Sequence, residues 1–298
     1  MQRRSFIKNT GLCAIAVSTS GFIRFDGNRY VGDCETTTDI LGPFYRPGSP
    51  LRNNLIIKGQ PGTPVELSGT IKHNDCITPY KKAKIELWHC GSDGVYDNTS
   101  GEYRYRGTGY CDDNGHYLFK TILPVPYDTG AGFIRPAHFH LMITAPGYQP
   151  LVTQLYFSGD PHISKDLSSA SPAAKRRILD IQTLASGTKK VLFDVSLSDK
   201  LAVEPAAMGK LAGIYIDEKD TTNTTELFVQ NNILWMRNNV FGENLQYMGN
   251  NTFQVAGLPS GMSQTFLFEL MTEGSVRLMT TSVDEKGQKQ TAVLLRGK

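Results

Sequence analysis

The 298-residue sequence has few cysteines, few tryptophans and no long apolar run. Its five cysteines form no Cys-x-x-Cys pair, so a thiolate zinc site has little support. No segment is apolar enough for a stable membrane-spanning helix. The formal net charge of +3 arises at the N-terminus, where Arg3, Arg4 and Lys8 stand without an acid before residue 23. The rest of the chain is formally neutral and shows no basic patch that would indicate nucleic acid binding.

The N-terminal segment predicts export. Paired arginines open the run from Arg3 to Lys8, and the short apolar stretch Gly11 to Phe22 follows it. This order of residue types resembles a twin-arginine export signal. We expect residues 1–30 to be signal and linker and the protein to be periplasmic or extracellular. The alternative is a frayed basic start of a cytoplasmic protein. Lipid anchoring at Cys13 is disfavoured because the bulky Leu12 precedes it.

Removal of the signal would take Cys13 with it and leave four cysteines: Cys34, Cys76, Cys90 and Cys111. An even number of cysteines in an exported protein is compatible with disulfides. Four cysteines allow three pairings, and the sequence does not select among them.

Residues 31–203 contain short β-like runs separated by turns, a pattern typical of a β-sandwich. Asp93-Gly94 and Asn114-Gly115 are two of these turns. One helix is predicted, with Ser171 as N-cap, Pro172 at its first position and a body that continues to Leu184. The expected strands are Val65 to Ile71, Lys84 to His89, Tyr117 to Ile122, Phe139 to Thr144, Leu151 to Phe157 and Val191 to Leu197.

A second unit, residues 206–298, consists of further short β-like runs between Gly213 and Leu295, joined by turns such as Asn231-Asn232. This pattern predicts a small antiparallel barrel or sandwich. The unit has no histidine, no cysteine and no cluster of carboxylates, so we expect an accessory domain of unknown role. The predicted fold class is therefore all-β, a sandwich with one short helix followed by a small barrel or sandwich.

Two histidines two residues apart supply the strongest chemical signal. On an extended chain His138 and His140 point to the same face, so both imidazoles can reach one metal ion. Tyr96 and Tyr117, which lie upstream, could add phenolate oxygens, hard anionic donors that favour ferric iron. Taken singly, each tyrosine is more commonly a half-buried strand residue with its hydroxyl in water. The combination of the four residues predicts an iron site.

Six ordered motifs around these residues match one family. The segment from residue 36 to 198 resembles the intradiol ring-cleavage dioxygenases, and most closely the protocatechuate and catechol dioxygenases. The motifs begin with Gly42-Pro43-Phe44-Tyr45 and continue as Ile85 to Trp88, Gly94 to Tyr96, Asp113 to Pro124, Arg135 to His140 and Thr153 to Pro161.

The resemblance implies an Fe(3+) cofactor held by four ligands: Tyr96, Tyr117, His138 and His140. It implies that a small catechol-like molecule and O2 are the substrates and that the ring opens between its two hydroxyls to a muconate-type dicarboxylate. Tyr117 would leave the metal and accept a substrate proton. Arg135 would stabilise negative charge on the ring, and Gln154 would hydrogen-bond toward the same pocket. Tyr45 and Tyr127 are expected to line the substrate mouth.

Two other functions stay open at this point. An exported β-sandwich can be a non-catalytic binding protein. His89, where the family commonly has glutamine, could complete a three-histidine zinc site with His138 and His140 and thus a zinc hydrolase. The chain lacks the N-terminal helical segment through which catechol dioxygenases dimerise, so the oligomeric state is open and a homo-oligomer is compatible with the sequence. The physiological catechol is not determined by the sequence.

Overall fold

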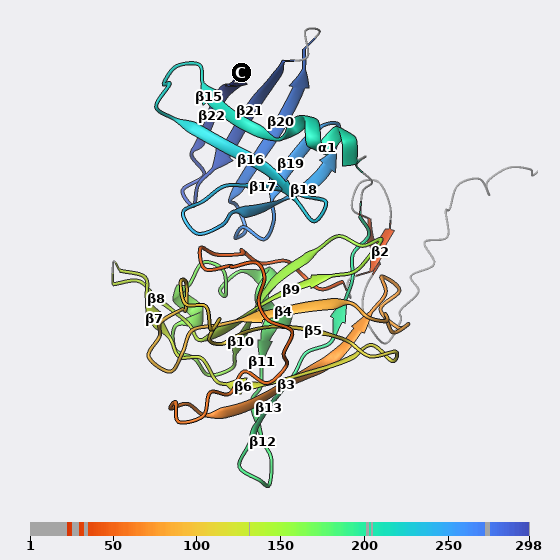
Figure 1. Ribbon diagram of the computed structural model, residues 1–298, viewed down its shortest axis with the longest axis vertical. Coiled ribbons are helices and arrows are strands. Elements are labelled where there is room, and N and C mark those ends of the chain that lie inside the picture. The colour runs from red at the N-terminus through yellow and green to blue at the C-terminus, as the bar shows by residue number, and fades with distance from the viewer. Residues whose placement is uncertain are drawn as a thin grey trace, which may run out of the picture.

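The computed structural model describes residues 23–25, 30–32, 35–130, 132–200, 203, 205–271 and 275–297. The predicted signal at residues 1–22 and Cys34 lie outside these ranges. The described chain is almost entirely β-structure, which confirms the predicted fold class (Figure 1). Within these residues, no helix has the length and apolar character needed to cross a membrane.

Two sheets form the N-terminal sandwich. The first has the order β11 (Ile178–Leu179), β10 (Leu151–Phe157), β9 (His138–Thr144), β4 (Lys84–Trp88) and β5 (Arg106–Tyr110). The second has the order β12 (Gln182–Thr183), β13 (Lys189–Leu192), β3 (Pro64–Lys72) and β14 (Val195–Ser196), and β6 (His116–Ile122) also pairs with β3. Two separate pairs are β1 (Ile23–Phe25) with β2 (Tyr30–Gly32) and β7 (Tyr127–Asp128) with β8 (Ile134–Arg135).

The sandwich core lies between the two sheets and is built by alternation along each strand. Phe139, Leu141 and Ile143 of β9 are fully buried in this core. Because successive side chains of a strand point to opposite faces, His138 and His140 lie on the outer face of the first sheet. The site therefore lies outside the sandwich core.

The predicted helix after Ser171 is shorter than expected. Ser171 is the N-cap, its hydroxyl accepts a hydrogen bond from the Ala173 amide, and a 3-10 helix, η2, covers Pro172–Arg177. The continuation to Leu184 is wrong, because Ile178 pairs with Tyr156 of β10. An apolar β-branched residue there fills a strand position at the edge of the sheet. A further 3-10 turn, η1, covers Ile163–Lys165.

The C-terminal part is a closed barrel of eight antiparallel strands, the first of the two predicted alternatives, a small barrel or a sandwich. Phe253, Phe266 and Phe268 fill its interior. Helix α1 (Pro205–Leu211) precedes it and packs Met208 and Leu211 against the same core. The strands are β15 (Gly213–Asp217), β16 (Thr224–Gln230), β17 (Ile233–Met236), β18 (Glu243–Gly249), β19 (Thr252–Val255), β20 (Ser263–Leu270), β21 (Val276–Val283) and β22 (Lys289–Arg296).

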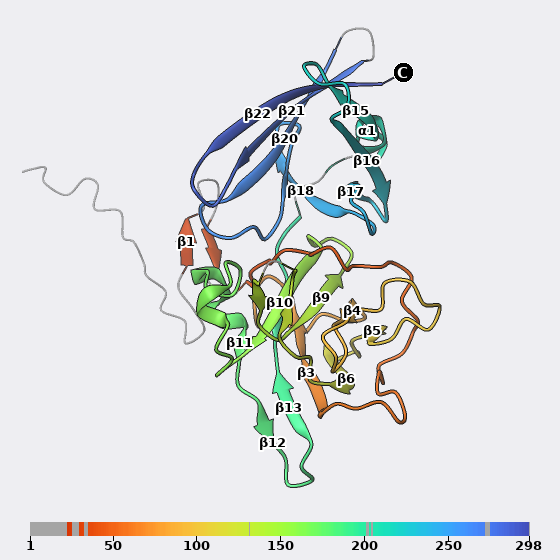
Figure 2. The same cartoon turned by 90° about the vertical axis from the view of Figure 1, so that its left-hand side faces the viewer.

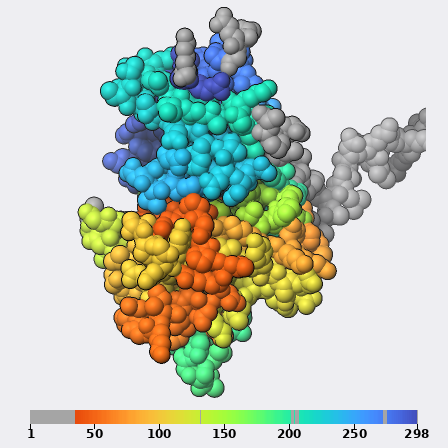
Figure 3. Space-filling model, in the orientation of Figure 1, coloured from red at the N-terminus to blue at the C-terminus, as the bar shows by residue number. Residues whose placement is uncertain are grey.

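The barrel sits on the side of the sandwich that carries the site. Figures 1 and 2 show the barrel above the sandwich from two directions, with the chain after residue 35 running between the two parts. The space-filling view shows this orange-red segment directly beneath the cyan and blue barrel (Figure 3). A hydrophobic cluster joins the parts and contains Leu41, Tyr45, Trp88, Cys90, Tyr96, Met142, Val152, Ile233, Trp235 and Phe241.

The cysteines differ in state. Cys76 is disulfide-bonded. Cys90 and Cys111 are free and buried. Of the pairings that the sequence left open, those between Cys76 and either of these two are therefore excluded.

Candidate metal centre and active site

The candidate site is built on the outer face of the first sheet. His138 of β9 pairs with Tyr156 of β10, and His140 pairs with Gln154 of β10 and with Trp88 of β4. All five side chains are at most 2% exposed. Strand register alone therefore gathers two imidazoles, an amide, a phenol and an indole on one buried surface.

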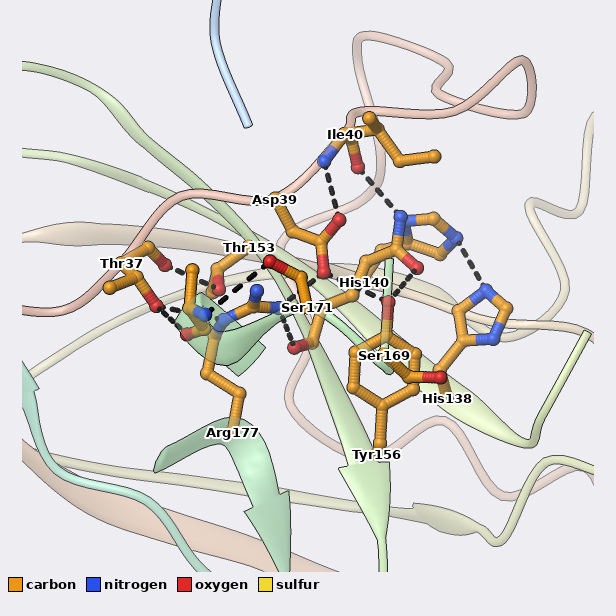
Figure 4. Close-up of polar contacts among 12 residues, drawn as sticks. Thr37, Asp39, Ile40, His138, His140, Thr153, Tyr156, Ser169, Ser171 and Arg177 are labelled. Atoms are coloured by element: carbon orange, nitrogen blue, oxygen red, sulfur yellow. Dashed lines mark hydrogen bonds and ion pairs between the residues drawn. The ribbon is translucent and has the colours of Figure 1, made fainter. Parts of the chain in front are cut away.

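The two imidazoles point their Nε2 atoms at each other, 3.1 Å apart (Figure 4). His138 Nδ1 donates to the Pro136 carbonyl at 2.6 Å, so its Nε2 presents a bare lone pair. Burial and the nearby Arg135 lower the pKa of His138 to about 3, and burial lowers the pKa of His140 well below its ordinary value. Both rings are therefore neutral near pH 7, the state in which imidazole binds a metal.

Tyr96 completes a triangle of donor atoms. Its Oη lies 3.3 Å from His138 Nε2 and 3.1 Å from His140 Nε2. Donors about 3 Å apart match neighbouring ligands on one metal ion, whose bonds to nitrogen and oxygen are about 2 Å long. Structure and sequence thus agree in placing Tyr96, His138 and His140 together.

Tyr127 is the second tyrosine of this cluster. Its ring centroid lies 5.5 Å from that of Tyr96 and 5.7 Å from that of His138. It stands at the base of the β7–β8 hairpin, where it pairs with Arg135. Tyr127 was expected to line the substrate mouth, and the structure places its ring against two candidate ligands. The usable signal was Pro124-Val125-Pro126-Tyr127 shortly after the strand β6, because two prolines there are incompatible with continued strand pairing.

The prediction that Tyr117 joins the metal cluster is wrong. Tyr117 is buried in the core between the two sheets, and its hydroxyl donates to the Phe193 carbonyl at 2.7 Å. It belongs to β6, which pairs with β3 in the second sheet. The first sheet therefore separates Tyr117 from the outer face that carries His138 and His140. Its role is to tie β6 to the chain at Phe193.

The donor set fits ferric iron. Burial raises the pKa of Tyr96 well above its ordinary value and also raises the pKa of Tyr127, on which Arg135 acts in the opposite direction. Both side chains therefore stay protonated unless a cation binds next to them. A bound metal ion would be such a cation and would convert both to phenolates. Two phenolates and two neutral imidazoles form the hard, partly anionic set that a ferric ion prefers.

A three-histidine zinc site is contradicted by the position of His89. Its Nδ1 donates to the Cys90 carbonyl and its Nε2 hydrogen-bonds with Thr121 Oγ1, both at 2.7 Å. Thr121 belongs to the second sheet, so His89 points into the sandwich core. Within the described part of the chain, no group of three His, Cys, Asp or Glu residues is placed to hold a metal.

Arg135 and Gln154 meet beside the cluster, as the sequence predicted. Arg135 Nη2 donates to Gln154 Oε1 at 2.8 Å, and Arg135 Nε pairs with Asp166 Oδ1 at 2.7 Å. The Gln154 amide in turn donates to the Ile40 carbonyl at 2.7 Å. The guanidinium is thereby held as a fixed buried positive charge next to the candidate metal ligands.

A second layer of buried polar residues was not predicted. Tyr156 donates from its hydroxyl to Asp39 Oδ2 at 2.8 Å, and Arg177 pairs with the same carboxylate (Figure 4). Arg177 also donates to the Gln154 carbonyl at 2.9 Å. Tyr156 could have been found from its spacing, because it is two residues after Gln154 and so shares its face. Asp39 and Arg177 carry no such signal.

The Gly42-Pro43-Phe44-Tyr45 motif covers the cluster. Gly42 has a φ of +73°, and a Cβ there would lie 3.3 Å from His140 Cε1. Phe44 stacks on Tyr96 with ring centroids 4.2 Å apart. Glycine is therefore required where the backbone of the motif passes His140. An aromatic residue stands where the motif packs on Tyr96.

Tyr45 does not line an open mouth. It is 6% exposed, and its ring lies between Trp88 at 5.1 Å and Trp235 of the barrel at 5.7 Å. Its hydroxyl donates to Glu86 Oε1 at 3.4 Å. Tyr45 is thus part of the packing between the sandwich and the barrel.

A family model described as "Dioxygenase" matches residues 40–199, more than half of the chain. The chain belongs to the intradiol dioxygenases. The chain is 35% identical over 158 residues to the chlorocatechol 1,2-dioxygenase of Rhodococcus opacus, and the match covers 45% of the chain and 61% of that relative. It is 34% identical over 200 residues to the catechol 1,2-dioxygenase of Candida albicans, with coverages of 57% and 65%. The chain thus spans less than two thirds of the length of these relatives.

Solved structures agree with this assignment. The chain resembles 3-chlorocatechol 1,2-dioxygenase from Rhodococcus opacus 1CP with a TM-score of 0.50 and 25% identity, over 55% of this chain and 72% of that one. It resembles catechol 1,2-dioxygenase from Acinetobacter sp. ADP1 with the same two values, over 57% and 66%. The barrel lies beyond the residues that the family model matches.

Proposed function

We propose that the chain is a non-heme Fe(3+) dioxygenase that cleaves catechol-type rings between the two hydroxyls with O2 and releases muconate-type dicarboxylates. The observation that carries this proposal is the convergence of Tyr96, Tyr127, His138 and His140 on one buried point beside a fixed arginine. Relatives named for catechol, chlorocatechol and hydroxyquinol support a small aromatic diol as substrate.

Tyr96, Tyr127, His138 and His140 would hold the iron. A bound ferric ion would supply a Lewis acid to which the catechol oxygens bind and which activates the ring toward O2. A catechol that binds as a dianion must lose two protons, and we assign Tyr127 Oη, as a phenolate, to accept one of them. Tyr127 is half-buried whereas Tyr96 is 6% exposed, so Tyr127 is the more accessible of the two phenols. The proton-accepting role expected of Tyr117 thus passes to Tyr127.

Arg135 would stabilise negative charge on the substrate ring and on the transition state. Asp166 and Gln154 already hold its guanidinium, so little reorganisation is needed during the reaction. A preorganised charge in a buried site is worth more than the same charge in water. Gln154 acts as a positioning residue, because its amide bridges Arg135 and the Ile40 carbonyl.

The metal assignment has a direct spectroscopic test. The protein loaded with Fe(3+) is expected to show a visible tyrosinate-to-iron charge-transfer band, and the band should shift when catechol is added without oxygen. Admission of O2 should then consume the catechol. A colourless protein that retains zinc and rejects iron would contradict the metal assignment. A red protein that binds catechol but consumes no O2 would leave the non-catalytic binding protein as the function.

Export through the twin-arginine route is part of the proposal. The residue order from Arg3 to Lys8 supports it, and so does the disulfide at Cys76, because disulfides persist in oxidising compartments. This route carries folded proteins, which suits an enzyme that takes up iron before export. Replacement of Arg3 and Arg4 by lysine is expected to retain the full chain in the cytoplasm, as measured by cell fractionation. Unchanged export of that variant would point to another signal.

A further inference from the structure

Residues 39–45 form the segment that covers the candidate metal ligands. The barrel contacts this segment at its first residue, Asp39. Gly257 has a φ of +77°, and a Cβ built there would lie 2.1 Å from the Asp39 carbonyl carbon and 2.2 Å from its oxygen. The two backbones therefore meet with no room for any side chain. Asp39 is also the carboxylate that accepts from Tyr156 and pairs with Arg177.

A second contact reaches the other end of the same segment. Trp235 of β17 stacks on Tyr45 with an interplanar angle of 5°, and Phe241 packs edge-on against Tyr45 at 5.5 Å. Tyr45 packs on Trp88, and Trp88 stacks on His140 at 4.9 Å with an angle of 9°. An unbroken series of ring contacts therefore runs from the barrel to a metal ligand.

A third contact reaches the helix that supplies Arg177. Ser260 of the barrel hydrogen-bonds through Oγ with Oγ of Ser171 at 3.2 Å. Ser171 is the N-cap of η2, at whose end Arg177 lies. The barrel thus contacts both segments that fix the Asp39 network, although the family model covers none of the barrel.

We propose that the barrel is a positioning domain of the active site. It holds residues 39–45 against the outer face of the first sheet and thereby fixes the His140 ring and the buried Asp39 carboxylate. The domain expected to be accessory is thus part of the catalytic unit, with Gly257 and Trp235 as its positioning residues. The expected effect on kcat rests on the proposed ring cleavage. The expected ordering of residues 39–45 by the barrel does not depend on that function.

Gly257→Ala in the full chain tests the proposal, with Gly261→Ala as matched control. Both glycines have positive φ, but a Cβ at Gly261 meets nothing within 4 Å. Both variants therefore carry the strain of a side chain at positive φ, and only Gly257→Ala pushes the barrel away from Asp39. We expect Gly257→Ala to lower kcat by about tenfold to hundredfold, the loss typical of a misplacement of about 1 Å. Gly261→Ala should stay within about twofold of the parent chain.

Amide hydrogen exchange of the metal-free protein gives the readout that does not depend on activity. Residues 39–45 should exchange faster in Gly257→Ala than in Gly261→Ala, while strands β20 to β22 stay protected in both. Trp235→Leu should show the same faster exchange and a shifted tyrosinate-to-iron band, and Trp235→Phe should restore both. Equal exchange and equal kcat in the two alanine variants would overturn the positioning role. A parent chain that cleaves no catechol would overturn the proposed function, and the exchange comparison would still decide whether the barrel orders residues 39–45.

Discussion

Tyr127→Phe is expected to lower ring cleavage by about 10²- to 10³-fold, the loss typical when one preorganised electrostatic contact in a transition state is removed. The phenyl ring keeps the packing against Tyr96 and His138 but removes the oxygen that would bind iron and accept the substrate proton. The charge-transfer band should weaken and move, because only Tyr96 then supplies a phenolate. Absorption spectra and steady-state kinetics of the iron-loaded variant measure both effects.

Tyr117→Phe is the matched control, since it removes one phenol hydroxyl from a ring that lies in the sandwich core, away from His138 and His140. Its hydroxyl donates to the Phe193 carbonyl, so the variant leaves a buried acceptor unpaired and should lose about 1–3 kcal/mol of unfolding free energy. Its visible spectrum and its activity should remain those of the parent chain. The opposite pattern, with the band lost in Tyr117→Phe and kept in Tyr127→Phe, would return Tyr117 to the metal and refute the site described above.

Arg135→Met is expected to separate stability from catalysis. The variant leaves Asp166, which is 2% exposed, as a buried charge without its partner, and breaking such a pair costs about 3–5 kcal/mol. Activity should fall by about 10²- to 10³-fold because the positive charge beside the substrate is gone. Denaturant unfolding and kcat measure the two losses independently.

A second substitution distinguishes the two roles of Arg135. Asp166→Asn added to Arg135→Met removes the orphaned charge and keeps an acceptor for the Ser169 amide, which bonds Asp166 at 2.8 Å. The double variant should regain a large part of the lost unfolding free energy and none of the lost activity. Recovery of activity along with stability would mean that Arg135 acts only by holding the fold together.

The sequence predicted those site residues whose positions follow from local spacing. His138 and His140 share a face because they are two residues apart on a strand, and Arg135 lies close before them. Gln154 came from the family motif, and the register of β10 against β9 places it opposite His140. Strand alternation and the pairing of consecutive strands depend on residues that are close in the sequence. A motif that spans neighbouring strands is therefore sufficient to predict these positions.

Tyr117 and Tyr127 show where local spacing fails. Tyr117 follows a turn and sits in an apolar strand, but the motif does not reveal which sheet that strand joins. Pairing of β6 with β3 turns the tyrosine into the core, and the choice between sheets depends on packing across the whole sandwich. Tyr127 reaches the metal cluster only because the short β7–β8 pair folds back beside Arg135.

The contact between barrel and sandwich also could not be predicted from the sequence. Trp235 and Gly257 carry no motif, and each is an ordinary barrel residue in its local context. Their roles arise where Tyr45 and Asp39, which are distant in the chain, come against them. Docking of two folded units is decided by complementary surfaces, which composition and periodicity do not encode.

Ring cleavage under ¹⁸O₂ by the iron-loaded full chain tests most directly the proposed dioxygenase activity with cleavage between the two hydroxyls. A catechol incubated with the protein should consume one O2 per ring and give a muconate-type dicarboxylate with one labelled oxygen in each carboxylate, as read by mass spectrometry. A ring opened beside the hydroxyl pair to a semialdehyde would contradict cleavage between the hydroxyls. Absence of oxygen uptake from an iron-loaded, catechol-binding protein would contradict the dioxygenase activity itself.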